Sequence, residues 1–151
     1  MALRETVSGR VDAPPAATFA LVVDITRLPE WNRAITEVVV APAPLAPGTV
    51  WKVRIRALGQ SWVSKSQVVE LDPATLRFAY RSQSDDGNPS YADWAWQVES
   101  DGESGSRVSV TVELEPLTFW RRHLLVKFRR PALRREMHAS LDALASALHT
   151  V

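Results

Sequence analysis

Apolar and polar side chains alternate through the middle of the chain, over 35–114. Within 49–57, for example, Trp51, Val53 and Ile55 take every second position and basic residues fill most of the positions between them. A period of two is typical of antiparallel strands with one face on the core and the other in water. Turns rich in Pro, Gly and Asp separate the alternating segments. The pattern therefore predicts six strands, over 35–41, 49–57, 61–71, 75–81, 91–99 and 107–114.

The two ends of the chain follow other patterns. Residues 2–11 alternate weakly and predict a first strand, and the two prolines after it suit the first turn of a helix. Short helices are expected over 15–23 and 24–32. Near the C-terminus the apolar period becomes 3.6, so 118–149 predict one long helix, straight or kinked at Pro131.

These elements predict a single α+β domain spanning 1–151. The long helix must bury its apolar stripe, and the only large apolar surface available is the inner face of the sheet. A sheet of about seven antiparallel strands is therefore expected to curve around that helix. Such an arrangement leaves a concave apolar space, which is a common place for small ligands to bind.

Short motifs along the chain resemble the helix-grip fold of the START/Bet v 1-like (SRPBCC) superfamily, and in particular the bacterial polyketide cyclase/dehydrase and lipid-transport family. They are Ala13-Pro14, Phe19, Asp24, Leu28-Pro29-Glu30-Trp31-Asn32, Gly48, Val68 to Pro73, and the Leu141-x-x-Leu144 stripe. The resemblance implies two short helices after the first strand and a long C-terminal helix packed across the concave face. Trp31 is expected to be a lid residue that packs on the sheet.

Three functions are compatible with this fold. The first is binding of a small hydrophobic or amphipathic molecule, lipid- or polyketide-like, between the sheet and the C-terminal helix. The second is a polyketide aromatase/cyclase or dehydratase that acts on a carrier-bound substrate. The third is a protein-interaction domain whose cavity is filled by its own side chains. Fold alone does not decide among them.

The inward-facing positions define the candidate ligand site. Six Trp in 151 residues is a high count, and both core packing and an aromatic cavity wall explain it. Ser64, Ser66 and Tyr80 are the polar groups expected to face inward. The full set is Trp51, Val53, Ile55, Trp62, Ser64, Ser66, Phe78, Tyr80, Trp94, Trp96, Val110 and Val112 from the sheet, with Leu124, Phe128 and Met137 from the helix.

The hairpin between the strands predicted over 49–57 and 61–71 decides which face of 61–71 is buried. If Gly59 and Gln60 form its loop, Ile55 lies opposite Ser64 and Lys65 points to water. A loop of three residues would reverse every side chain and bury the lysine. We adopt the first register, because burying an unpaired Lys is costly.

Composition excludes several classes of protein. The chain has 46% hydrophobic and 23% charged residues, which is typical of globular domains. It contains no Cys, which excludes disulfides and thiol nucleophiles. No apolar run approaches the ~18 residues of a membrane span. The first residues lack the apolar stretch of a signal peptide, so we expect a cytoplasmic protein.

No pattern for catalysis or for a cofactor stands out. Ser104 lies in a Gly-rich turn between two strands, which is the wrong context for a nucleophile elbow. The spacings of His123, His138 and His149 match no metal pair on one helical face. Phosphate and dinucleotide fingerprints are absent from the sequence. We therefore expect no metal and no cofactor, and the sequence assigns no catalytic residue.

Charge is unevenly placed along the chain. Residues 1–120 hold 11 basic and 15 acidic side chains, whereas 121–151 hold 7 basic and 2 acidic ones. The basic stretch 121–135 is either a solvated helix face or a site for an anionic partner, such as an acyl carrier protein or an anionic lipid. Such a partner is expected at Arg129, Arg130 and Arg134. Nucleic acid is not expected, because the remaining residues are net acidic.

Overall fold

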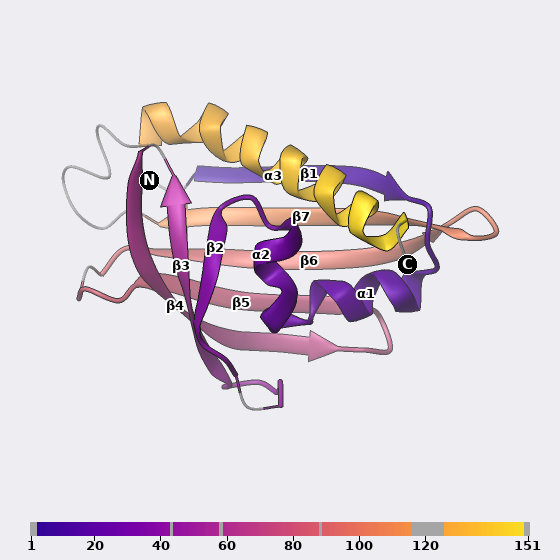
Figure 1. Cartoon of the computed structure of the whole chain (residues 1–151), viewed down its shortest axis with the longest axis horizontal. Helices are drawn as coiled ribbons and strands as arrows, with labels where there is room; N and C mark the ends of the chain where they lie inside the picture. Colours follow the sequence, from indigo (N-terminus) through magenta and orange to yellow (C-terminus); the bar gives the residue numbers. More distant parts are fainter. Residues whose placement is uncertain (1–2, 43, 58, 88, 116–125, 150–151) are drawn as a thin grey trace.

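The structure, a computed structural model, describes residues 3–42, 44–57, 59–87, 89–115 and 126–149, with side chains in the last range from 131 to 148. Its elements follow the predicted order (Figure 1). They are β1 (Leu3–Val11), α1 (Pro15–Val22), a 3-10 turn (Ile25–Arg27), α2 (Leu28–Trp31), β2 (Ile35–Val40), β3 (Val50–Ala57), β4 (Gln60–Asp72), β5 (Arg77–Ser84), β6 (Tyr91–Asp101), β7 (Gly105–Glu115) and α3 (Val126–His149).

One curved sheet holds all seven strands, in the order β1-β7-β6-β5-β4-β3-β2. Every neighbouring pair is antiparallel, so successive hairpins run from β2 to β7 and β1 joins beside β7. The three helices lie on one side of this sheet, with α3 running along β1 (Figure 1). The predicted α+β helix-grip architecture is confirmed.

The core lies between the sheet and the helices. Val7, Val108 and Val110 from the sheet are at most 2% exposed, and Leu133 and Leu144 of α3 are equally buried. Gly9 of β1 lies against α3, and a β-carbon at this position would make an ordinary contact of 3.6 Å with Leu141 Cδ1. The apolar stripe of α3 therefore covers the β1 side of the concave face.

The predicted register of the β3–β4 hairpin is wrong by two residues. Ala57 pairs with Gln60, and Ile55 lies opposite Trp62 and not opposite Ser64. Gly59 takes φ +74°, a left-handed conformation that glycine adopts without strain and that tight hairpins require. A shift of two keeps every side chain on its predicted face.

The predicted bounds of β5 are also wrong. The strand begins at Arg77, because Leu76 belongs to the preceding turn and has φ +56°. Its far end extends beyond the predicted residue 81 to Ser84, where it still pairs with β4. This extension adds Ser82 and Ser84 to the concave face.

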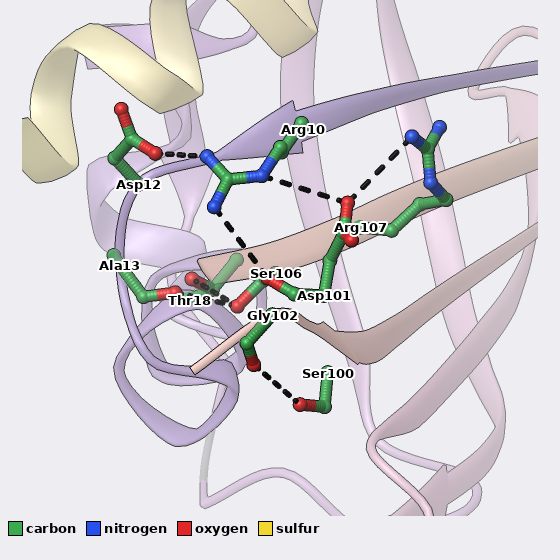
Figure 2. A network of polar contacts seen from close by, with 9 residues as sticks. All are labelled: Arg10, Asp12, Ala13, Thr18, Ser100, Asp101, Gly102, Ser106 and Arg107. Atoms are coloured by element: carbon green, nitrogen blue, oxygen red, sulfur yellow. Dashed lines mark hydrogen bonds and ion pairs between the residues drawn. The ribbon is translucent and has the colours of Figure 1, made fainter. Parts of the chain in front are cut away.

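A polar network closes the end of the fold where α1 meets the β6–β7 hairpin (Figure 2). Ser106 Oγ donates a hydrogen bond of 2.6 Å to the Ala13 carbonyl and accepts one of 3.3 Å from Thr18 Oγ1. Both hydroxyl residues are fully buried. Outside them, Arg10 pairs with Asp12 and Asp101. The network fixes α1 to the sheet, and its polar atoms are satisfied by each other.

Candidate ligand site on the concave face

Inward-facing residues on neighbouring strands lie opposite one another and form rows across the concave face. Near the start of β4 and the end of β5, Ser64 lies opposite Ser84 and Ser66 lies opposite Ser82. We call these four residues the serine patch. Ser64 and Ser66 are buried, while Ser82 and Ser84 are half-buried. The patch is small and polar, and Trp51 of β3 borders it opposite Ser66.

Four aromatic rings adjoin the serine patch, and we call them the aromatic cluster. The Tyr80 ring centroid lies 5.1 Å from that of Trp51, 5.3 Å from that of Phe78 and 6.4 Å from that of Trp94. Edge-to-face and offset contacts at these distances are favourable beyond simple burial. Trp94 stays half-buried, whereas Trp51 and Phe78 are 1% exposed. The cluster is thus packed on one side and accessible at Trp94.

Hydrogen bonds orient two hydroxyls of the serine patch. Ser64 Oγ donates to the Gln83 carbonyl at 3.3 Å, because a carbonyl can only accept. Trp94 Nε1 donates to Ser82 Oγ at 3.2 Å, because an indole N–H can only donate. The hydroxyl hydrogen of Ser64 is therefore bonded to a backbone carbonyl, and the hydroxyl oxygen of Ser82 already accepts a hydrogen bond.

Tyr80 stands at the centre of the aromatic cluster with its phenol protonated. Burial raises the pKa of Tyr80 to about 12, and a hydrogen bond with Trp96 acts more weakly in the opposite direction. The side chain therefore carries no charge at neutral pH. It presents to the concave face an apolar ring and a neutral hydroxyl.

Helix α2 covers the next row of the concave face. Trp31 is fully buried, and its ring meets Trp96 edge to face with 5.3 Å between centroids. Its Nε1 is the one buried side-chain nitrogen or oxygen without a hydrogen-bond partner among the described residues. Ser140 of α3 accepts a hydrogen bond of 2.9 Å from the Arg33 amide, which joins α3 to the residues after α2. The expectation that Trp31 packs on the sheet as a lid agrees with these contacts.

One carboxylate faces inward from the edge of the sheet. Glu5 of β1 lies between Leu3 and Val7 in the alternation, its side chain is 11% exposed, and Arg134 Nη1 of α3 pairs with it at 3.0 Å. This pair was not among the residues predicted from the sequence. The signal was present, because the alternation within β1 already put Glu5 on the face that carries Val7.

A sequence model of the polyketide cyclase / dehydrase and lipid transport family matches residues 3–149. The chain belongs to this family. Known structures with the same fold include the Zhui aromatase/cyclase from Streptomyces sp. R1128, with a TM-score of 0.79 and 15% identity over 99% of this chain and 94% of that one. The protein TTHA0849 from Thermus thermophilus has a TM-score of 0.76 and 21% identity over 98% of both chains. Ara h 8.0201 has a TM-score of 0.76 and 19% identity over 100% of both chains.

A search of curated proteins found no match. The structural likenesses are all below 25% identity, so they establish the helix-grip fold and leave the ligand open. The resemblance to the polyketide cyclase/dehydrase and lipid-transport family in the sequence motifs is confirmed.

Most predicted site residues lie together in this family member, although their role in binding stays a prediction. Ile55, Trp62 and Trp94 are half-buried on the inner face. Leu124 and the side chain of Phe128 lie outside the described part of the chain. The others are buried, namely Trp51, Val53, Ser64, Ser66, Phe78, Tyr80, Trp96, Val110, Val112 and Met137.

The basic stretch is described only in part. Arg134 pairs with Glu5, so its charge is balanced within the fold. The side chains of Arg129 and Arg130 lie outside the described residues, and the predicted patch for a carrier protein or anionic lipid stays a prediction. No helix in the described ranges is long and apolar enough to cross a membrane. Within the same ranges, His, Asp and Glu side chains form no cluster suited to a metal ion.

A depression of about 390 Å³ lies on the opposite, convex face of the sheet. Its floor includes Ala79 and Ala95, and longer charged side chains surround it. The three arginines around it already form ion pairs: Arg4 pairs with Glu113, Arg77 with Glu70 and Arg81 with Asp93. We therefore place the candidate site on the concave face.

Proposed function

We propose that the protein binds a small hydrophobic or amphipathic molecule, lipid- or polyketide-like, between the sheet and α3. One observation carries the proposal. At the end of the concave face that holds the serine patch, Trp94, Ala92 and Leu114 are only half-buried, whereas Trp96, Val98 and Val108 at the covered end are at most 3% exposed. Accessible apolar surface on a concave face is a typical ligand site.

Binding without chemistry is better supported than turnover. On the inner face of the described strands, Glu5 and Tyr80 are the only ionisable side chains. Glu5 is paired with Arg134, and Tyr80 keeps its proton because burial raises its pKa to about 12. General acid–base catalysis requires a group whose pKa lies near the working pH, and Tyr80 does not meet that requirement as placed. An aromatase/cyclase or dehydratase activity is the second candidate, because the family description names such reactions.

Two matched variants on one strand test the proposal. Ala92 points inward and Ala95 points outward from β6. Ala92→Trp fills the accessible end of the concave face, while Ala95→Trp adds the same ring to the convex face. Binding of the neutral fluorescent probe N-phenyl-1-naphthylamine is titrated for both variants and the parent. Circular dichroism and the thermal midpoint confirm that each variant is folded.

The expected result is that the parent and Ala95→Trp bind the probe and Ala92→Trp does not. Native mass spectrometry of freshly purified parent should also show a co-purified small molecule. Failure of the parent to bind the probe, or equal binding by the two variants, would reject the proposal and favour a filled interior. Conversion of a carrier-bound polyketide by the parent would instead establish the cyclase or dehydratase alternative.

A further inference from the structure

We propose that Ser64 and Ser82 form a polar subsite for an uncharged, hydroxyl-bearing end of the ligand, and that the concave face discriminates against carboxylates. This inference rests on the proposed binding function and specifies the chemistry of its ligand. The remainder of the ligand then lies against the aromatic cluster, which borders the serine patch at Trp51 and Trp94.

The orientation of the two hydroxyls carries the inference. Ser64 donates its hydrogen to the Gln83 carbonyl, so its oxygen is the group that remains for a ligand, as an acceptor. Ser82 accepts the indole hydrogen of Trp94, so its own hydrogen remains, as a donor. Both serines face inward on the paired strands β4 and β5, one row apart. Ser64 and Ser82 therefore offer one acceptor and one donor in adjacent rows of the patch.

Only some ligand groups match this combination. A hydroxyl donates one hydrogen and accepts through its lone pairs, so it satisfies both serines at once. A carboxylate only accepts, so it would bond to Ser82 and place a negative charge against the lone pairs of Ser64. A hydrocarbon end would leave both serine groups without partners in a desolvated site, which is also unfavourable.

The charges around the serine patch also disfavour a carboxylate. A buried anion is tolerated only when a cation or several donors compensate it. Among the described inward-facing strand residues there is no cation, and Arg134 of α3 is already paired with Glu5. Trp94, which holds Ser82 in its donating orientation, also stacks on Tyr80 at 6.4 Å. The same residue thus links the polar subsite to the apolar surface.

The test compares two ligands with the same ring system, 2-naphthol and 2-naphthoate, and a larger neutral probe. Isothermal titration calorimetry at neutral pH measures the affinity of the parent for 2-naphthol, for 2-naphthoate and for N-phenyl-1-naphthylamine. We expect 2-naphthol to bind more tightly than 2-naphthoate. Ser64→Ala and Ser82→Ala should each weaken 2-naphthol by about 2- to 10-fold, the effect of one lost hydrogen bond, and leave N-phenyl-1-naphthylamine unchanged. Ser109→Ala, on the convex face of β7, is the matched control and should change neither affinity.

The outcomes separate this inference from the binding function. Probe binding combined with equal or tighter binding of 2-naphthoate would overturn the subsite and leave the binding function intact. Equal weakening of naphthol and the probe in the serine variants would show that these serines only support the structure, and would also overturn it. Absence of probe binding in the parent would reject both proposals. If Ser82→Ala fails to fold, Ser64→Ala gives the same comparison from the other strand.

Discussion

Alkaline titration of Tyr80 tests whether the aromatic cluster is dry. Burial raises the pKa of this phenol from its ordinary value of 10.0 to about 12. Above pH 10 the unfolded chain therefore loses a proton that the folded chain keeps. The unfolded state binds fewer protons there, so the free energy of unfolding falls as the pH rises. The stability contributed by the neutral phenol is complete below pH 10 and is lost progressively between the unfolded and folded pKa values.

The magnitude follows from the two pKa values. A difference of two units corresponds to about 2.7 kcal/mol once both states are titrated. Between pH 9 and pH 11 the loss attributable to Tyr80 is about 1.3 kcal/mol, since the folded phenol is still mostly protonated at the upper limit. Tyr80→Phe removes this contribution and keeps the ring. The parent should therefore lose about 1.3 kcal/mol more than Tyr80→Phe over this interval, because all other groups titrate in both proteins.

Two measurements check the prediction. Urea denaturation at pH 9 and pH 11 gives the difference in unfolding free energy between the parent and Tyr80→Phe. The chain has only two tyrosines, so in a Tyr91→Phe background the near-ultraviolet absorbance of tyrosinate reports on Tyr80 alone. We expect a midpoint near 12 in the folded protein and near 10 in urea. A folded midpoint near 10, or parallel losses in the two proteins, would refute the assignment of Tyr80 to a dry cluster.

Three further substitutions test the packing around the site by urea denaturation. Ser106→Ala leaves the buried Ala13 carbonyl without its 2.6 Å hydrogen bond and should lower the unfolding free energy by about 1–3 kcal/mol; a loss within about 0.5 kcal/mol would contradict the network. Gly105→Ala places a β-carbon 2.7 Å from the Asp101 carbonyl and should destabilise by about 1 kcal/mol or more, whereas a neutral effect would show that the hairpin yields. Trp31→Phe removes a buried N–H that has no partner and should change the free energy of unfolding by less than about 1 kcal/mol. Trp31→Ala removes the whole ring and should lower it by about 3–5 kcal/mol. Equal losses in the two variants would indicate that the N–H has a hydrogen-bond partner.

The alternation in the sequence was sufficient to predict which strand residues face the inside of the sheet. It placed Trp51 and Val53 of β3, Ser64 and Ser66 of β4, and Trp96 of β6 inward, and all five are buried. The alternation succeeds because one face of each strand meets the core, so the period of two leaves a strong signal. The predicted faces of β3 and β4 stayed correct although the hairpin register was wrong, since a shift of two residues keeps each side chain on the same face.

The sequence located only the β4 half of the serine patch. Ser82 and Ser84 continue the alternation of β5, but serine is neutral in an apolar pattern, so the predicted strand stopped too early. Leu76 led to the opposite error, because a leucine suggests a strand and the structure puts it in a turn with positive φ. The hydrogen bond from Trp94 to Ser82 depends on the pairing of β5 with β6, which only the fold supplies.

The serine patch is also a departure from what stability alone would favour. Central strands of a sheet gain most from β-branched and aromatic residues, because these fill the surface between neighbouring strands. Four serines in adjacent positions of β4 and β5 bury little apolar area, and Ser64 and Ser66 nevertheless lie at 2% and 3% exposure. At the other end of the same strands, Val68 and Phe78 fill the corresponding positions and are covered. Local choices that sacrifice packing are expected where a site requires room and hydrogen-bonding groups. The change in composition along β4 and β5 therefore supports the proposed ligand site at the serine-rich end of the concave face.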